Sequence, residues 1–178
     1  MSNGGVLRID LTLDENNLED GARKLLYLVR PEWNQEEINF KVFTSGISNK
    51  VVAGFRPEAK SDIVLIRIYG KNLDLLIDHE TEIQTFAILH QSSQAGCGAK
   101  LYARYNNGLC YEYLPGVILD PKTVREERIY KLIIKEMIKM HSIKPQDGAV
   151  TSPCLFRLMD RWLSILPETF EGKEKQKR

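Results

Sequence analysis

Two charged residues, Arg67 and Glu82, lie where their side chains could bind an anion together. Arg67 is the only charged residue within Ile63–Tyr69, an uninterrupted aliphatic run that is typical of a buried strand. A buried guanidinium needs an acceptor with two-pronged geometry, which means a carboxylate, a phosphate or both. Glu82 is an acid in the early turns of an amphipathic helix expected over 77–90. The pattern therefore predicts an anionic partner for Arg67, and Glu82 is one acid that the following helix could supply.

Less specific interpretations apply to both residues. Arg67 could lie on an edge strand and pair with Asp62 or Glu80, and Glu82 could be a solvated helix charge. The aliphatic neighbours of Arg67 favour burial. Glu82 gains a role only if it meets Arg67.

A short turn precedes this strand and could contribute to the same site. Residues 44–50, Thr-Ser-Gly-Ile-Ser-Asn-Lys, place small and turn-forming side chains between two apolar runs. Such a turn lets backbone N–H groups point into one concavity, which suits an anion. Taken alone, a glycine-containing turn is more often a plain hairpin loop.

The remaining pattern predicts the elements that position these residues. We expect a short edge strand at 6–9, a helix at 18–29 capped by Asp14 or Asn16 and ended by Arg30-Pro31, and meander strands at 38–42, 50–55 and 62–69. After the helix at 77–90 we expect a hairpin of strands 101–105 and 109–114, a hinge at Pro115-Gly116, a long helix beginning after Asp120-Pro121, and a helical segment at 155–166. Met137, Met140 and Trp162 are expected in the core, and Cys97 and Cys110 are expected to be inert thiols.

Composition excludes several classes of function. The 178 residues carry 25 Lys plus Arg against 24 Asp plus Glu, so no field of one sign favours nucleic acid or an acidic membrane. Three cysteines without a CxxC pair indicate neither a zinc site nor a disulfide framework. No apolar stretch is long enough to span a membrane, and the first residues lack a signal-peptide pattern. A reduced, cytoplasmic protein is expected.

The order of elements predicts an α+β fold of protein-kinase type. An antiparallel sheet with one helix would form the small lobe and continue into the first helices of the large lobe. The corresponding division is a flexible segment at 1–14, the small lobe at 15–114, the hinge at 115–119 and the start of the large lobe at 120–178.

Four stretches together resemble the choline/ethanolamine kinase family. They are Thr44–Lys50, Val64–Gly70, Glu82–Leu89 and Asn106–Tyr113. The last of them, Asn-Asn-Gly-Leu-Cys-Tyr-Glu-Tyr, is more similar to the ethanolamine kinases than to the choline kinases. The resemblance runs from about residue 21 to the end of the chain.

The resemblance implies phosphorylation of ethanolamine by ATP with Mg²⁺, the first step towards phosphatidylethanolamine. By position it implies a phosphate loop formed by Ser45, Gly46, Ile47, Ser48 and Asn49. It also implies that Arg67 clamps the phosphates and that Glu82 orients Arg67. Glu112 and Leu114 would form the adenine hinge. Arg67 stands where protein kinases carry lysine.

The catalytic signature of a kinase has no counterpart in these residues. None of His79, His90 and His141 begins a His-x-Asp-x-x-x-x-Asn run, and no aspartate precedes a phenylalanine. We therefore expect the ATP-binding half of an ethanolamine kinase, truncated and inactive alone, with catalytic residues and metal ligands beyond Arg178. A non-catalytic binding or regulatory module and a choline kinase are the alternatives, and pairing of the chain with itself or with another protein is left open.

Overall fold

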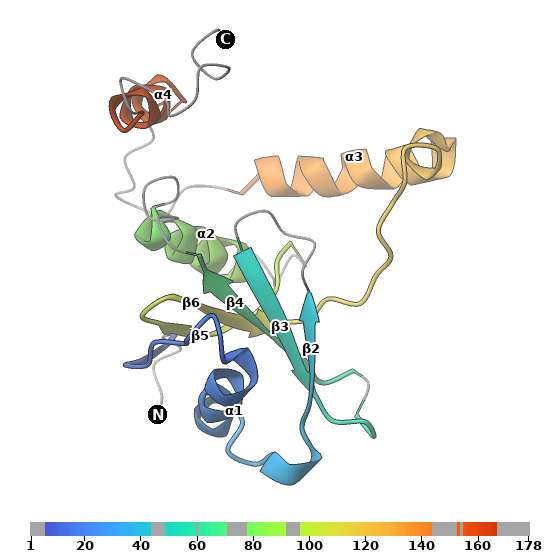
Figure 1. Ribbon diagram of the computed structural model, residues 1–178. Coiled ribbons are helices and arrows are strands. Elements are labelled where there is room, and N and C mark those ends of the chain that lie inside the picture. Colours follow the sequence, from blue (N-terminus) through green and yellow to red (C-terminus); the bar gives the residue numbers. More distant parts are fainter. Residues whose placement is uncertain are drawn as a thin grey trace, which may run out of the picture.

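The computed structural model describes residues 6–43, 49–59, 61–70, 78–91, 97–143, 153 and 155–166. Six strands form one sheet in the order β1-β5-β6-β4-β3-β2 (Figure 1). The strands are β1 (Leu7–Ile9), β2 (Asn39–Phe43), β3 (Asn49–Phe55), β4 (Ile63–Tyr69), β5 (Leu101–Tyr105) and β6 (Gly108–Glu112). The helices are α1 (Leu18–Val29), α2 (His79–Gln91), α3 (Glu127–His141) and α4 (Leu155–Ser164), with 3-10 turns η1 (Gln35–Glu37) and η4 (Thr123–Arg125). The predicted α+β class is confirmed.

Alternation along β4 gives the sheet two faces, and each face is covered by one helix. Val64, Ile66 and Ile68 are buried in a core that also contains residues of α1. Tyr69 belongs to a second cluster, which packs against partly buried side chains of α2. The separation follows from the two-residue period of a strand. In Figure 1, α1 and α2 accordingly lie on opposite sides of the sheet.

The edge strand predicted at 6–9 is confirmed as β1, but other features of the two edges differ from expectation. β1 pairs in parallel with β5, whereas the other neighbouring strands are antiparallel. Ile9 and Leu13 are buried, at 7% and 2% exposed, although a flexible segment was expected at 1–14. At the opposite edge, β2 was expected to be half-buried, but four of its five residues are exposed. An edge strand has a neighbour on one side only, which leaves side chains such as Val42 in solvent.

The beginning of α1 was assigned to the wrong residue. Its N-cap is Asn17, not Asp14 or Asn16. The Asp14 carboxylate instead accepts the N–H of Asn16 at 2.9 Å, which closes a local turn before the helix. The helix ends at Val29, before Arg30-Pro31, as the restriction on a residue preceding proline predicts.

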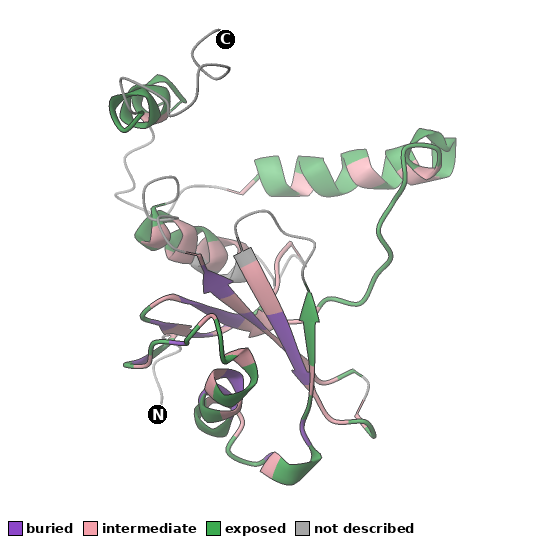
Figure 2. Cartoon of the chain, in the orientation of Figure 1, coloured by how far each residue is buried: buried purple, intermediate pink, exposed green. Residues whose placement is uncertain are grey.

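The helices after the hinge show the largest departures. Asp120 accepts the N–H groups of Lys122 and Thr123 and so closes a local turn before η4, whose N-cap is Lys122, and α3 begins only at Glu127. No residue of α3 or α4 is buried (Figure 2). The expectation that Met137, Met140 and Trp162 belong to the core is therefore wrong, since they are 50%, 48% and 39% exposed. A helical apolar face shows that something can pack there, but not that the described residues supply it.

None of the described helices is long and apolar enough to cross a membrane.

Candidate functional site

Arg67 projects from the face of β4 that α2 covers. Its neighbours in the strand, Ile66 and Ile68, point into the core on the α1 side, so Arg67 faces the other way. The Arg67 side chain is 19% exposed, which makes it largely but not completely buried. A cation in this position keeps access to solvent while most of its stem is packed.

The acid that Arg67 was predicted to need is present. Arg67 Nη1 donates a hydrogen bond to Glu82 Oε1, and the Glu82 side chain is 16% exposed. The two residues lie on β4 and α2, and their partnership is the prediction on which the sequence interpretation depends. It is confirmed.

The N-terminus of α2 is held by Asp78, which the sequence interpretation overlooked. The Asp78 Oδ1 atom accepts the N–H of Glu80 at 3.1 Å, and the Asp78 carbonyl accepts the N–H of Glu82 at 3.0 Å. Hydrogen bonds, first of all from the Thr81 hydroxyl, lower the pKa of Asp78. An Asp followed three residues later by a hydroxyl at the start of a helical pattern is a capping signal that could have been found.

A tyrosine hydroxyl also fixes the main chain at Arg67. Tyr105 Oη donates to the Arg67 carbonyl at 2.7 Å. Gly108 lies against the same carbonyl, because a Cβ at this position would be 2.0 Å from the Arg67 oxygen and 2.3 Å from Tyr105 Oη. The Asn106-Asn107-Gly108 turn was predicted as a hairpin signal. Its glycine is also required by this close approach.

The entrance to the predicted phosphate loop lies at the level of Arg67. Cross-strand pairing places Phe43, Val51, Arg67 and Leu109 in one row across four strands. Phe43 is the last residue of β2, so residues 44–48 follow directly from this row. Ser45, Gly46, Ile47 and Ser48 lie outside the described residues, and of Asn49 only the backbone is described, as the first residue of β3.

Some backbone N–H groups of the predicted adenine hinge already form hydrogen bonds within the sheet. The Glu112 N–H donates to the Lys100 carbonyl at 2.9 Å, and Glu112 Oε2 accepts the Lys100 N–H at 3.0 Å. The Tyr113 N–H donates to the Ile63 carbonyl at 3.2 Å. Leu114 follows the strand and is 57% exposed. Of the two predicted hinge residues, Glu112 and Leu114, Leu114 is therefore the one whose N–H we retain as a candidate donor.

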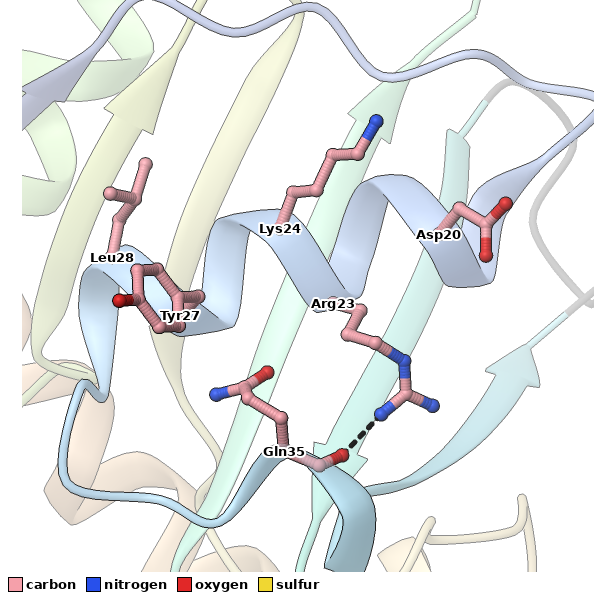
Figure 3. A pocket seen from close by; sticks show the side chains of 6 residues that line it. All are labelled: Asp20, Arg23, Lys24, Tyr27, Leu28 and Gln35. Atoms are coloured by element: carbon pink, nitrogen blue, oxygen red, sulfur yellow. Dashed lines mark hydrogen bonds between the residues drawn. The ribbon is translucent and has the colours of Figure 1, made fainter.

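A separate surface pocket of about 400 Å³ lies along α1 (Figure 3). Its walls include Arg23, Tyr27 and Gln35, and Arg23 Nη1 donates to the Gln35 carbonyl. None of the predicted site residues lines it. Because α1 covers the face of the sheet opposite α2, this pocket is not part of the Arg67 site.

A protein-family model matches most of the sequence of this chain. The model of the choline/ethanolamine kinase family matches residues 40–178. The chain belongs to the choline/ethanolamine kinase family. The predicted resemblance is confirmed.

Individual members of this family are similar along nearly the whole chain. Ethanolamine kinase 1 of Mus musculus is 36% identical over 176 residues, which cover 97% of this chain and 48% of that protein. Ethanolamine kinase 2 of Homo sapiens is 39% identical over 156 residues, which cover 88% and 39%. The chain thus spans about half the length, or less, of these curated relatives.

Solved structures of the family share the fold. An ethanolamine kinase of Plasmodium vivax superposes with a TM-score of 0.64 at 22% identity, covering 87% of this chain and 40% of that one. A choline kinase of Cryptosporidium parvum gives a TM-score of 0.61 at 22% identity, covering 78% and 40%. The kinase-like fold expected from the order of elements is confirmed.

Among the described residues, no group of three or more His, Cys, Asp or Glu side chains is arranged to hold a metal ion.

Proposed function

We propose that this chain is the ATP-binding part of an ethanolamine kinase, in which Arg67 grips phosphate oxygens of ATP and Glu82 orients Arg67. One observation carries the proposal: Arg67, which pairs with Glu82 of α2, lies in the same cross-strand row as Phe43, the last residue before the predicted phosphate loop. Arg67 therefore lies at the level at which β2 ends and the predicted phosphate loop begins. A guanidinium and the backbone N–H groups of such a loop would suit the same anion.

The geometry of the pair explains how the clamp would work. A guanidinium has five N–H donors in a rigid fork, and the Glu82 contact uses one of its terminal nitrogens. We propose that the other donors bind phosphate oxygens, whose geometry matches the fork. The Glu82 charge offsets the cost of holding Arg67 mostly out of water. ATP would therefore meet a cation that is already oriented, which reduces the entropy lost on binding.

The adenine would lie farther along the same sheet. Glu112 pairs with Val64, three residues along β4 from Arg67. At about 3.3 Å per residue this is roughly 10 Å, so only an extended ligand can reach both places. We propose that the Leu114 N–H binds the adenine edge while Arg67 binds the phosphates at the other end.

Further parts of the proposal follow from the family rather than from the geometry. We propose ethanolamine as the acceptor and Mg²⁺ as the companion of ATP, because the relatives above are named ethanolamine kinases and kinases use metal-bound nucleotides. We also propose a reducing, cytoplasmic location, which suits Cys110 as a buried free thiol.

ATP binding by the purified 178-residue chain tests the proposal. Isothermal titration calorimetry with Mg-ATP should show saturable binding, and a phosphate-transfer assay with ethanolamine should show no product, because the chain has no kinase catalytic-loop sequence. A folded chain that does not bind ATP would contradict the ATP-binding role. Phosphoethanolamine formed by the chain alone would contradict the assignment of catalysis to residues outside it.

A second candidate function is a non-catalytic module that pairs with a full-length ethanolamine kinase. One observation favours it: α3 exposes Leu132, Met137 and Ile138 at 53%, 50% and 60%, and α4 exposes Phe156 at 75%. Apolar surface of this kind marks an interaction site. Analytical ultracentrifugation with a full-length ethanolamine kinase tests it. Complex formation that Leu132→Glu with Ile138→Glu abolishes, and Arg67→Ala leaves intact, would support this function, whereas no complex would exclude it.

A further inference from the structure

Tyr69 contacts both members of the Arg67–Glu82 pair and has no role in the function proposed so far. We propose that Tyr69 is a positioning residue, which holds the Glu82 carboxylate in the orientation that directs Arg67 at phosphate. This inference rests on the proposed ATP-binding function and deepens it.

The two oxygens of Glu82 have different donors. Tyr69 Oη donates to Oε2 at 2.5 Å, while Arg67 Nη1 donates to Oε1. Both donors come from β4, two residues apart and on the same face. The terminal torsion of a glutamate is otherwise broad, so a single donor would leave the carboxylate free to rotate. Two donors from one rigid strand restrict it to a single plane.

Tyr69 is itself held in place by its main chain and by its ring. The Tyr69 main-chain N–H donates to the Asn107 carbonyl at 2.9 Å, and Tyr69 is only 5% exposed. The ring also stacks on His79, with centroids 3.8 Å apart and an angle of 10° between the planes. His79 and Glu82 lie three residues apart on α2, so α2 contacts Tyr69 from two successive positions on one side of the helix. A shift of α2 along β4 would disturb both contacts together.

The chemistry of the phenol suits a permanent donor. Burial raises the pKa of Tyr69 above its usual range, and the hydrogen bond and charge of Glu82 raise it further. The phenol therefore keeps its proton in neutral solution and donates to Glu82. The Arg67 guanidinium lies 5.6 Å from the centre of the same ring, so removal of the hydroxyl alone leaves this cation–π contact in place.

A double-mutant cycle measured as ATP affinity of the 178-residue chain tests the inference. Tyr69→Phe should weaken ATP binding about three- to tenfold, since a hydrogen bond to a charged acceptor is lost. In a Glu82→Ala background the same substitution should change affinity by less than about twofold, because its target is gone. A purely structural role for Tyr69 would reduce affinity equally in both backgrounds.

Tyr102→Phe is the matched control. Tyr102 is also a strand tyrosine that loses one hydroxyl, but it packs against the core on the α1 side of the sheet, where the Arg30 guanidinium lies 4.0 Å from the centre of its ring. Tyr102→Phe should change ATP affinity by less than about twofold, because the side chain lies on the face of the sheet opposite α2. His79→Ala is the second variant should Tyr69→Phe fail to fold. It leaves the hydroxyl in place and removes the stacked ring, so it should weaken binding in the same direction and lose this effect when Glu82 is alanine.

The results distinguish a failure of the positioning role of Tyr69 from a failure of the ATP-binding role of Arg67. Unchanged affinity in Tyr69→Phe, or an equal loss with and without Glu82, overturns the positioning role while ATP binding still depends on Arg67. If Arg67→Ala binds ATP as well as the unaltered chain, the proposed phosphate site itself is wrong.

Discussion

Glu82 of α2 and Arg67 of β4 form a largely buried ion pair, with side chains 16% and 19% exposed. A second ion pair joins the sheet to the same helix, Arg104 of β5 with Glu80, but its side chains are 27% and 63% exposed. Exposed pairs contribute about 0–1 kcal/mol because water and salt screen them. Helix α2 thus offers the sheet one largely buried acid, Glu82, and one exposed acid, Glu80. The Arg104–Glu80 pair is therefore a control for the Arg67–Glu82 pair.

Gly108→Ala should destabilise the sheet next to Arg67. The added Cβ would lie 2.0 Å from the Arg67 carbonyl oxygen, which is backbone and cannot swing aside. We expect a loss of about 1–3 kcal/mol in the free energy of unfolding, as for other overpacked sites, measured by urea titration. Gly116→Ala is the control, because nothing lies within 4 Å of a Cβ there. Equal stability of the two variants would show that β6 does not approach Arg67 as described.

Leu114→Pro tests the adenine end of the site. Proline removes the N–H that we propose for the adenine edge, and the position is 57% exposed and already precedes a proline. ATP affinity should fall about three- to tenfold while the melting temperature stays within about 3 °C, since one hydrogen bond is lost. Val117→Pro, at an 85% exposed residue three positions later, should leave affinity unchanged. Similar binding by both variants would move the adenine elsewhere.

Alkaline pH should destabilise the fold through Cys110. Burial raises the pKa of this thiol to about 12, whereas an unfolded thiol titrates near about 8.5. The folded state therefore favours the protonated thiol. Its contribution to stability is complete below about pH 8.5 and is lost as the pH rises towards 12, by at most about 1.4 kcal/mol per pH unit. Urea titrations between pH 8 and 10 should show a smaller decrease for Cys110→Ala, and an identical decrease would assign the effect to other groups.

Local signals predicted most of the small lobe. The Asn-Gly turn, the residue before Pro31 and the aliphatic run of β4 each act over a few residues, and all of these elements are present. A lone cation in an apolar strand predicted that Arg67 needs an acidic or phosphate partner, and the kinase-like order of elements predicted that this partner is Glu82. Tyr69 was overlooked since a tyrosine in a strand reads as ordinary packing, although its place two residues after Arg67 puts it on the same face.

The predictions that were wrong concern features that depend on residues distant in the sequence. Asp120-Pro121 closes a local turn before η4 and does not cap α3, which starts six residues after Pro121 at Glu127. Met137 and Met140 form an apolar face with no buried position, because periodicity reports which face is apolar and not what covers it. Register and sheet order, which bring the end of β2 level with Arg67, are non-local and could be read only from the structure.

The most direct measurement compares ATP affinity in Arg67→Ala and Arg104→Ala by calorimetry on the 178-residue chain. Both substitutions remove a strand arginine that pairs with α2. Loss of Arg67 should weaken ATP binding about tenfold or more, because charge-assisted bonds to phosphate contribute about 1.5–3 kcal/mol, whereas loss of Arg104 should leave it unchanged. Equal affinities in the two variants would contradict the claim that Arg67 holds the phosphates of ATP.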